Sequence, residues 1–397
     1  MSAARQWRIS GGRVVTPAGV IAPGEVVIRG ERLVAVGPYG AFGKDPGEKV
    51  VSADGCWVIP GFIDLHFHGA VGADVMDASA ASLLSLSLFH ARHGTTAFLA
   101  TTVSAPREEL REVVRRAAAW SEEGDGGARL LGVHLEGPYL NPAYAGAQPS
   151  AWLRPPDREE MADLLAIAPG CVKMVTLAPE LPGALELIGF LRQQKVVVAA
   201  GHTGATFAQA RPALRAGLSH VTHLFNAMRP LHQREPGLAG LALAEPVLGF
   251  SLIADGVHVH PAMLKIALGL PRRGCPVLIS DALPLCGRDK GTYTWCGRRV
   301  TLQEGGARLD DGTLAGSVTT LDRALLNLTR WLDQDLPAVL PLVTANPARL
   351  LGMMGEMGRL VPGALADLAV LDDGLEVCLT VVGGRVVYAG PAFSGVP

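Results

Sequence analysis

Long apolar runs, clusters of one charge and paired cysteines are all missing from this chain. No apolar stretch is long enough to span a bilayer, and the opening residues MSAARQWRIS lack the apolar core of a signal peptide, so we expect no membrane partner. Lysine and arginine number 35 against 37 aspartates and glutamates, which gives a formal net charge of −2. Because no basic excess or polybasic run is present, we also expect no nucleic-acid partner.

The six cysteines are scattered along the chain, without a C-x-x-C pair. We expect reduced thiols in a cytoplasmic protein, with the closest pair, Cys286 and Cys296, unbonded. Only 5% of the 397 residues are aromatic whereas 49% are hydrophobic, so aliphatic side chains must fill a large interior. This length is comfortable for two domains.

Both ends of the chain read as short strands joined by glycine-bearing turns. β-Branched residues recur in WRISGGRVV, GEVVIRG, RLVAVG and EKVVSADG near the amino terminus and in EVCLTVVGGRVVYAG near the carboxyl terminus. In the last of these segments, Gly383 and Gly384 lie between two apolar runs, as in a tight hairpin. We therefore expect one small β-sandwich domain formed by residues 1–56 and 355–397, with a larger domain inserted at 57–354.

The middle of the chain alternates apolar strands with helical segments such as Arg107–Trp120 and Phe207–Ala216. Eight segments read as strands: FIDLH, GTTAFLATT, RLLGVHLEG, CVKMVTLAPE, KVVVAAGH, SHVTHL, GFSLIADG and PVLISDA. This alternation predicts an α/β fold with a parallel sheet, and eight repeats favour a (β/α)8 TIM-type barrel. An open doubly wound sheet is the alternative, although no G-x-G-x-x-G follows the first strand. Residues 288–313 break the alternation and predict a β-rich insertion over the barrel mouth, or an ordinary surface hairpin.

Ionisable side chains fall where these apolar runs stop. They are His66 and His68 after the first strand, Glu136 after the third, His202 after the fifth, His223 after the sixth, His258 after the seventh and Asp281 after the eighth. His66 and His68 share one face, because a strand turns successive side chains to opposite faces. Since the carboxyl ends of barrel strands carry the active site, this placement predicts a metal-dependent hydrolytic site.

The ligand types indicate which metal such a site would hold. Imidazole and carboxylate groups without clustered cysteine suit zinc or iron(II). Glu136, His202 and His223 make one three-ligand site that leaves a position open for water, as catalytic metal sites do. A second ion can be held or bridged by His66, His68 and Asp281. We therefore expect one or two divalent metals per subunit.

Other histidines are expected to have structural parts. His134 lies two residues before Glu136 on the same strand face and is expected to pack beside the ligands or support them. His220 should face away from the site, and His90 and His93 should be solvated on the flank of a helix.

A series of motifs then points to a family. The segments HFHGAVGADVMDA, GVHLEGPYLNP, GHTGAT, THLFNAM, REPGLAG, DGVHV, SDAL and LAGS follow one another in order. With them the chain resembles the N-acetylglucosamine-6-phosphate deacetylases of the amidohydrolase superfamily over essentially its whole length. HLEGP, THLFNAM and REPGLAG are specific to this branch. The resemblance implies deacetylation of N-acetyl-D-glucosamine 6-phosphate to D-glucosamine 6-phosphate and acetate in amino-sugar catabolism, by a homodimer.

The resemblance also implies roles for the matching residues. Glu136, His202 and His223 would be the principal metal ligands, and Asp281 the catalytic acid and base. The residues that would contact the substrate are Ala147, Asn226 and Ala227, the phosphate ligands Arg234 and His258, and a sugar and acetyl pocket of Leu314, Ala315 and Gly316. One or both phosphate ligands can come from a neighbouring subunit.

At one position the chain departs from some members of the family. Where these have a histidine that polarises the acetyl carbonyl, Gln148 follows Ala147 here. Its amide can donate a hydrogen bond, although not as a cation. Because both histidines of the H-x-H motif are kept, we hypothesise that a second metal takes over part of this polarisation.

Three other functions stay open at this point. An N-acetylgalactosamine-6-phosphate deacetylase differs only in the epimer of its substrate, which these motifs do not distinguish. Another amidohydrolase, such as a cyclic-amide hydrolase or a deaminase, often bridges two metals with a carboxylated lysine, whereas the fourth strand ends in VTLAPE without one. A catalytically inactive, ligand-binding barrel is disfavoured by the intact set of candidate ligands.

Overall fold

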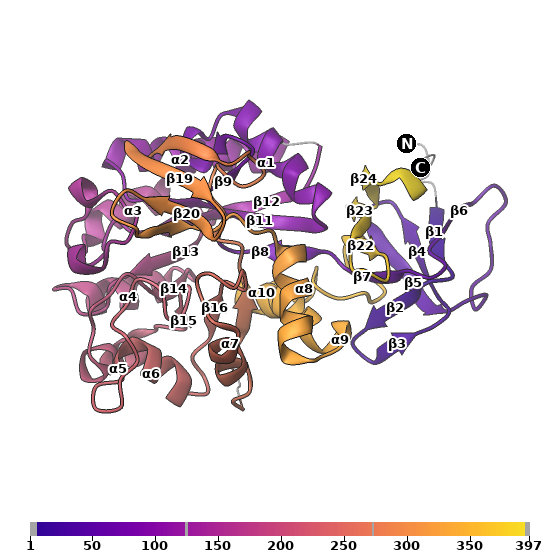
Figure 1. Cartoon of the computed structure of the whole chain (residues 1–397). Helices are drawn as coiled ribbons and strands as arrows, with labels where there is room; N and C mark the ends of the chain where they lie inside the picture. The colour runs from indigo at the N-terminus through magenta and orange to yellow at the C-terminus, as the bar shows by residue number, and fades with distance from the viewer. Residues whose placement is uncertain (1–5, 124–125, 272–273, 394–397) are drawn as a thin grey trace.

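The structure, a computed structural model, describes residues 6–123, 126–271 and 274–393. A large α/β part lies beside a smaller β-rich part that holds both ends of the described chain (Figure 1). Among the described residues, no helix combines the length and apolar character needed to cross a membrane. All six cysteines are free thiols, Cys286 and Cys296 included, as the sequence predicts.

The eight strands expected in the middle of the chain are all present. They are β8 (Phe62–Asp64), β11 (Thr95–Thr102), β12 (Arg129–Glu136), β13 (Val172–Leu177), β14 (Val197–Ala200), β15 (His220–Val221), β16 (Phe250–Leu252) and β17 (Pro276–Leu278). The first six form one parallel sheet in chain order, and β16 and β17 form a parallel pair. Parallel sheets are buried on both faces, which explains why every residue of β11 is buried.

Backbone hydrogen bonds continue beyond this sheet at both of its edges. The Val221 N–H of β15 donates to the Gly249 carbonyl beside β16, at 3.0 Å. At the opposite edge, the Asp281 N–H after β17 donates to the His66 carbonyl after β8, at 2.9 Å. The sheet is therefore curled, and the end of its last strand lies next to the end of its first.

Ten α-helices join and cover these strands within the described ranges. They are α1 (Ala80–Arg92), α2 (Arg107–Glu123), α3 (Arg158–Ile167), α4 (Ala184–Gln193), α5 (Phe207–Ala216), α6 (Gly237–Ala244), α7 (Pro261–Leu268), α8 (Leu321–Leu332), α9 (Leu336–Val339) and α10 (Ala345–Leu350). Helix α5 has the predicted bounds because a capping box of Thr206 and Gln209 begins it and Gly217 follows its end. Helix α2 continues three residues past the predicted Trp120.

The two faces of the curled sheet bury different apolar clusters. Ile63, Leu99, Met174 and Val277 alternate with residues of the other face and form one cluster inside the curl. The other face packs against the helices in the largest cluster of the molecule. Side chains therefore fill both sides of each strand, and the polar site can lie only at the strand ends.

Strands from both ends of the chain share a sheet in the smaller part. A four-stranded sheet has the order β5 (Arg32–Pro38), β4 (Gly24–Arg29), β1 (Gln6–Ser10) and β6 (Lys49–Ser52). A six-stranded sheet has the order β24 (Arg385–Ala389), β23 (Val377–Val382), β22 (Leu368–Leu371), β7 (Trp57–Pro60), β2 (Arg13–Thr16) and β3 (Gly19–Ile21). Ile9, Val26, Val58 and Val370 belong to one apolar cluster that draws on both sheets.

The smaller part extends further along the chain than its expected limit at residue 56. Strand β7 pairs in parallel with β2 and antiparallel with β22, so Trp57–Pro60 belongs to the six-stranded sheet. Gly383 and Gly384 join β23 to β24 as the predicted hairpin turn, both with positive φ.

The β-rich segment after β17 is a four-stranded antiparallel sheet. Its strands are β18 (Gly291–Trp295), β19 (Arg298–Gln303), β20 (Gly306–Leu309) and β21 (Leu314–Gly316). It runs to Gly316 rather than 313, because β21 pairs with β20. Immediately after it, the Ser317 N–H donates to the Asp281 carbonyl at 2.9 Å, which ties this sheet to the end of β17.

Candidate metal centre

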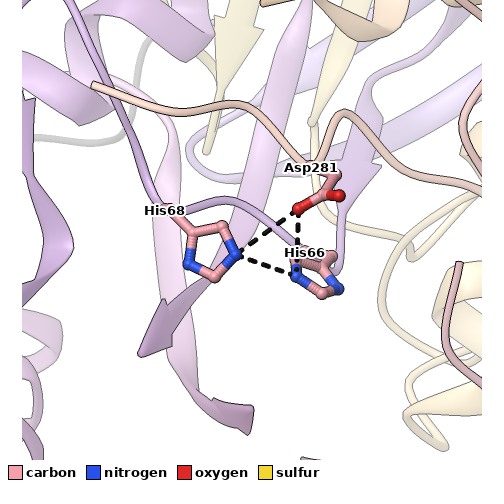
Figure 2. A group of neighbouring side chains, drawn as sticks. All are labelled: His66, His68 and Asp281. Atoms are coloured by element: carbon pink, nitrogen blue, oxygen red, sulfur yellow. Dashed lines mark hydrogen bonds and ion pairs between the residues drawn. The ribbon is translucent and has the colours of Figure 1, made fainter. Parts of the chain in front are cut away.

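Six buried side chains converge at the carboxyl ends of the parallel strands. His66 and His68 follow β8, Glu136 ends β12, His202 follows β14, His223 follows β15 and Asp281 follows β17. They form two groups, His66 with His68 and Asp281, and Glu136 with His202 and His223. Within each group the ligand atoms lie within 4.8 Å of one another. The first group comes from the two strands that the curl brings together, and its side chains point toward one another (Figure 2).

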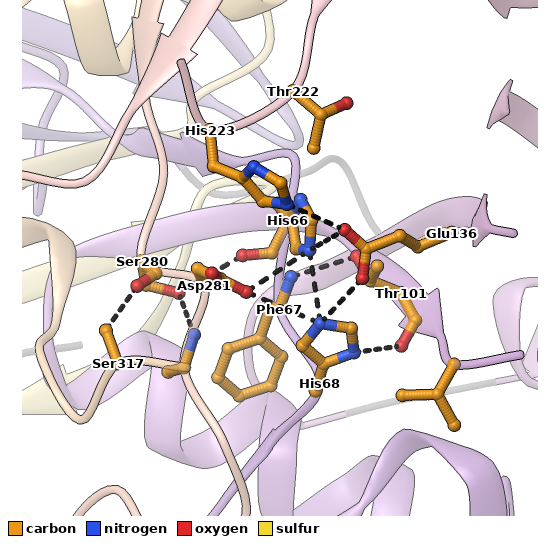
Figure 3. Close-up of polar contacts among 12 residues, drawn as sticks. His66, Phe67, His68, Thr101, Glu136, Thr222, His223, Ser280, Asp281 and Ser317 are labelled. Atoms are coloured by element: carbon orange, nitrogen blue, oxygen red, sulfur yellow. Dashed lines mark hydrogen bonds and ion pairs between the residues drawn. The ribbon is translucent and has the colours of Figure 1, made fainter. Parts of the chain in front are cut away.

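Glu136 lies between the two groups and contacts both. Its Oε1 atom is 3.2 Å from Nε2 of His202 and 3.1 Å from Nε2 of His223. Its Oε2 atom is 3.3 Å from Nε2 of His68, in the other group (Figure 3). One carboxylate therefore offers an oxygen atom to each group.

Carbonyl groups outside the centre set the orientation of two imidazoles. Nδ1 of His68 donates to the Thr101 carbonyl at 3.0 Å, and Nδ1 of His202 donates to the Tyr144 carbonyl at 3.0 Å. Because a carbonyl only accepts, each ring carries its proton on Nδ1 and presents the lone pair of Nε2 to the centre. This tautomer is the one that a metal-ligating histidine needs.

The donor set fits a divalent cation. Nε2 atoms of His66 and His68 lie 3.1 Å apart, as do those of His202 and His223. Burial opposes the charged form of both carboxyl groups, yet nearby imidazoles lower the pKa of Asp281 to about 2 and hold that of Glu136 well below its usual range. Two buried carboxylates among converging lone pairs call for a positive charge, and nitrogen with oxygen ligands suits zinc or iron(II).

Three of these six residues have a left-handed backbone. The φ angles are 47° for His202, 31° for His223 and 49° for Asp281. Such conformations cost non-glycine residues about 1–3 kcal/mol each and persist only where the surroundings hold them. The placement of the ligands is thus maintained by contacts beyond the centre.

A cavity of about 400 Å³ opens over the two groups. Thirteen residues expected at the site line it: His68, Glu136, Ala147, Gln148, His202, His223, Asn226, Ala227, His258, Asp281, Leu314, Ala315 and Gly316. His66 is not among the described lining residues and lies behind them, 3.3 Å from the carboxylate of Asp281. Arg234 is exposed, and it too is absent from the described lining.

The sequence did not point to several other lining residues. They are Gly146, Phe225, Trp295, Arg308 and Thr313. Three of them, Trp295, Arg308 and Thr313, come from the segment between β17 and β21. Because this segment was expected over the barrel mouth, some of its side chains could have been predicted to line the cavity.

Gln148 is bound at both ends of its amide. The Ser104 N–H donates to Oε1 at 2.7 Å, and Nε2 donates to Oε2 of Glu136 at 2.6 Å. The first contact fixes which end of the amide faces the centre. One of the two amide hydrogens is therefore directed to a candidate metal ligand.

Three histidines outside the ligand set, His90, His134 and His220, are buried. His134 is fully buried, and its Nε2 forms a hydrogen bond with Thr176 Oγ1 at 2.8 Å. Its ring packs edge-on against the His66 ring, as expected of a supporting residue. His220 is also buried, and burial lowers its pKa to about 3. The expectation that His90 is solvated is wrong, because its ring packs against Phe67 and Phe98.

At another part of the cavity, His258 is paired with an acid. Its Nδ1 donates to Oδ2 of Asp255 at 2.6 Å, which leaves Nε2 for a ligand. Burial opposes the charge of Asp255, but the bond from His258 lowers its pKa. The bond to Asp255 therefore fixes the orientation of the His258 ring, which lines the cavity.

Buried imidazoles and carboxylates at the carboxyl ends of a curled parallel sheet define a metal-centred enzyme of the hydrolytic class. The model of the amidohydrolase family matches residues 57–387. The chain therefore belongs to the amidohydrolase family.

Two relatives show which enzymes of this family the chain is similar to. It is 37% identical to the N-acetylglucosamine-6-phosphate deacetylase of Bacillus subtilis (strain 168), over 94% of this chain and 95% of that protein. It is 38% identical to an N-acetylgalactosamine-6-phosphate deacetylase of Escherichia coli O157:H7, over 83% of this chain and 87% of that protein.

A solved structure covers almost the whole chain. It is an aspartate-to-alanine variant of N-acetyl-D-glucosamine-6-phosphate deacetylase from Mycobacterium smegmatis in complex with N-acetyl-D-glucosamine-6-phosphate. It has a TM-score of 0.90 and 33% identity, and covers 97% of this chain and 100% of its own.

Proposed function

We propose that this chain hydrolyses the acetamide of N-acetyl-D-glucosamine 6-phosphate, releasing D-glucosamine 6-phosphate and acetate in amino-sugar catabolism. The observation that carries this proposal is the pair of buried ligand groups on the wall of one cavity. N-acetylgalactosamine 6-phosphate is the second candidate substrate, because a relative named for it is 38% identical to this chain.

The proposed architecture is a closed (β/α)8 barrel carrying the site and a β-sandwich domain built from both chain ends. The bonds from β15 to the segment at β16, and from the end of β17 to the end of β8, support closure. The apolar cluster shared by the two terminal sheets supports the sandwich. Because β7 pairs with β2 and β22, we place the boundary after Pro60 rather than at residue 56, with the second boundary near residue 355.

The residues of the centre divide the work of amide hydrolysis. A divalent cation held by Glu136, His202 and His223, and a second by His66, His68 and Asp281, would supply Lewis acidity and lower the pKa of water to about 7. Asp281, an acceptor when ionised, takes a proton from the water as its oxygen bonds to the acetyl carbon. It returns that proton to the nitrogen as the C–N bond breaks, so acetate and the amine leave.

Gln148 completes the acetyl end of the cavity. One hydrogen of its amide is directed to Glu136, and we assign the other to the acetyl carbonyl oxygen, on which negative charge develops. Ala315 and Gly316 wall the same cavity.

The phosphate end needs fixed positive charge. His258 and Asn226 line the cavity and supply donors. Arg308 is the sole lysine or arginine among the lining residues that the structure describes, and its Nη1 donates to the Gly312 carbonyl at 2.9 Å, which steadies the guanidinium. Arg234 is exposed outside its own cavity, so we propose that it enters the cavity of the second subunit in a homodimer.

Replacing Arg308 tests phosphate recognition. Arg308→Ala is expected to lower kcat/KM for the 6-phosphorylated sugar roughly 10- to 100-fold, mainly through KM, because a charged hydrogen bond contributes about 1.5–3 kcal/mol. Steady-state kinetics with the phosphorylated and unphosphorylated sugars measure the effect. Arg299→Ala is the matched control, since Arg299 lies on the neighbouring strand β19, outside the described lining, and pairs with the exposed Asp310. An equal loss for both sugars would exclude Arg308 from the phosphate site.

The function itself is tested by amine release from both 6-phosphorylated N-acetylhexosamines. We expect turnover of N-acetyl-D-glucosamine 6-phosphate with kcat/KM above about 10⁴ M⁻¹s⁻¹, the usual range for an enzyme on its own substrate. A higher value for the galacto epimer would assign the chain to that substrate instead. Binding of the sugar phosphates without amine release would show an inactive, ligand-binding protein, and hydrolysis of cyclic amides alone would show another amidohydrolase.

A further inference from the structure

Strand β13 ends beside the centre without contributing a ligand, and Glu180 lies three residues past its last residue, Leu177. We propose that Glu180 is a positioning residue that sets the orientation of His202 by holding the loop after β12 against the loop after β14. This inference rests on the proposed metal site. Glu180 is absent from the described cavity lining, so any effect on the reaction must pass through other residues.

Three donors from two loops converge on the Glu180 carboxylate. Nδ2 of Asn141 donates to Oε1 at 2.8 Å, and the Gly204 N–H donates to the same oxygen at 2.7 Å. The Thr203 hydroxyl donates to Oε2 at 2.5 Å. A carboxylate is the one side chain that offers two acceptor oxygens and no donor, which matches this set of partners.

The first route from Glu180 to His202 runs through the loop after β12. Asn141 begins the short 3-10 helix η2 (Pro142–Tyr144), where its side chain accepts from the Ala143 N–H. The carbonyl of Tyr144, the last residue of η2, accepts from Nδ1 of His202 at 3.0 Å. By fixing Asn141, Glu180 fixes the carbonyl that selects the tautomer and direction of the His202 ring.

The second route runs through the backbone next to His202. His202 has a φ of 47°, and the two residues that follow it, Thr203 and Gly204, are both bound to Glu180. The Asn141 N–H also donates to the His202 carbonyl at 3.0 Å. These bonds hold the carbonyl of a left-handed residue and the two residues that follow it, the condition under which such a conformation persists.

The loop after β12 and the loop after β14 pack closely against each other at Gly204. A Cβ atom on Gly204 would lie 2.6 Å from the Tyr144 ring and 3.2 Å from Nδ2 of Asn141. The loops therefore touch where Glu180 binds them. The group His66, His68 and Asp281 comes from β8 and β17, and none of its three residues bonds to Glu180 among the described contacts.

Zinc titration of the metal-free protein tests the inference without relying on turnover. We expect Glu180→Ala to weaken one of the two zinc equivalents at least tenfold while the other keeps its affinity, because only the group containing His202 is released. Glu180→Gln is expected to stay within a few-fold of the wild type. Its Oε1 can still accept from Asn141 and Gly204, and its amide can donate to the Thr203 hydroxyl.

Glu160 provides the matched control. It is buried and accepts from the Tyr139 hydroxyl at 3.1 Å and from Nε of Arg154 at 3.0 Å, so it binds the same loop on the side away from the centre. Glu160→Ala is expected to lower the melting temperature and leave both zinc affinities unchanged. Thr203→Val removes one donor without changing side-chain shape and should give a smaller loss at the same equivalent as Glu180→Ala.

Two results would overturn the inference. One is unchanged zinc affinity in Glu180→Ala, or in Thr203→Val should the alanine variant not fold. The other is an equal loss of zinc affinity in Glu160→Ala, which would mean general loosening of the loop. A wild-type protein that binds two zinc ions but releases no amine would refute the proposed function and leave this inference standing.

Discussion

Asp281→Asn is expected to lower kcat by about 10²–10⁴-fold, the range that general acid and base catalysis contributes. Asparagine keeps the size of the side chain but cannot accept the proton of the attacking water or return it to the leaving amine. The cavity stays formed, so substrate binding is expected to persist. Single-turnover amine release gives the rate, and calorimetry with the phosphorylated sugar gives the affinity.

The metal content of this variant is the essential control, because Asp281 also belongs to one of the two ligand groups. The group of Glu136, His202 and His223 does not include Asp281 and should retain its ion. Appreciable turnover by an Asp281→Asn protein that keeps this ion would rule out Asp281 as the acid and base.

Removal of the metal is expected to lower turnover by roughly a thousandfold, since a catalytic metal contributes several kcal/mol to the transition state. The protein is to be dialysed against a chelator, checked by elemental analysis and assayed. Zinc or iron(II) is then added back in steps. Recovery with either ion, and none with magnesium, would agree with the imidazole ligands, because magnesium prefers oxygen.

The shape of the recovery curve tests the second ion. If the ion near His66, His68 and Asp281 shares in polarising the acetyl carbonyl, turnover should keep rising between one and two equivalents. Full turnover at one equivalent would refute that hypothesis and leave Gln148 as the carbonyl donor. Chelation that leaves turnover unchanged would contradict metal dependence altogether.

The strand ends could be predicted from the sequence because they obey a local rule. An apolar run stops, and a histidine or acid follows it, as at Glu136 and His223. Side chains at the carboxyl ends of parallel strands meet at one edge, so the convergence followed from the order of the segments. The strands of the two terminal sheets could be predicted for the same reason, because short runs of β-branched residues and the glycine turns between them are local features of the sequence.

Contacts between distant segments could not be read in this way. Gln148 was expected at the site and lines the cavity, but nothing local in the sequence shows that the Ser104 N–H, 44 residues away, holds its amide against Glu136. His90 was expected in solvent, but two phenylalanines from other segments enclose it. The pairing of Trp57–Pro60 with Leu368–Leu371, more than 300 positions later, could not be read from the local sequence either.

That long-range pairing has a consequence for synthesis. The strand β7 is complete once residue 60 leaves the ribosome, but its partner β22 emerges about 300 residues later, roughly 15–60 s at ordinary elongation rates. During this interval β7 exposes an unpaired edge, which is a site for misassociation. The smaller β-rich part is therefore the first to be synthesised and the last to be completed. A truncated mRNA that lacks the codons of β22 would yield a protein that has the metal ligands but leaves the edge of β7 unpaired.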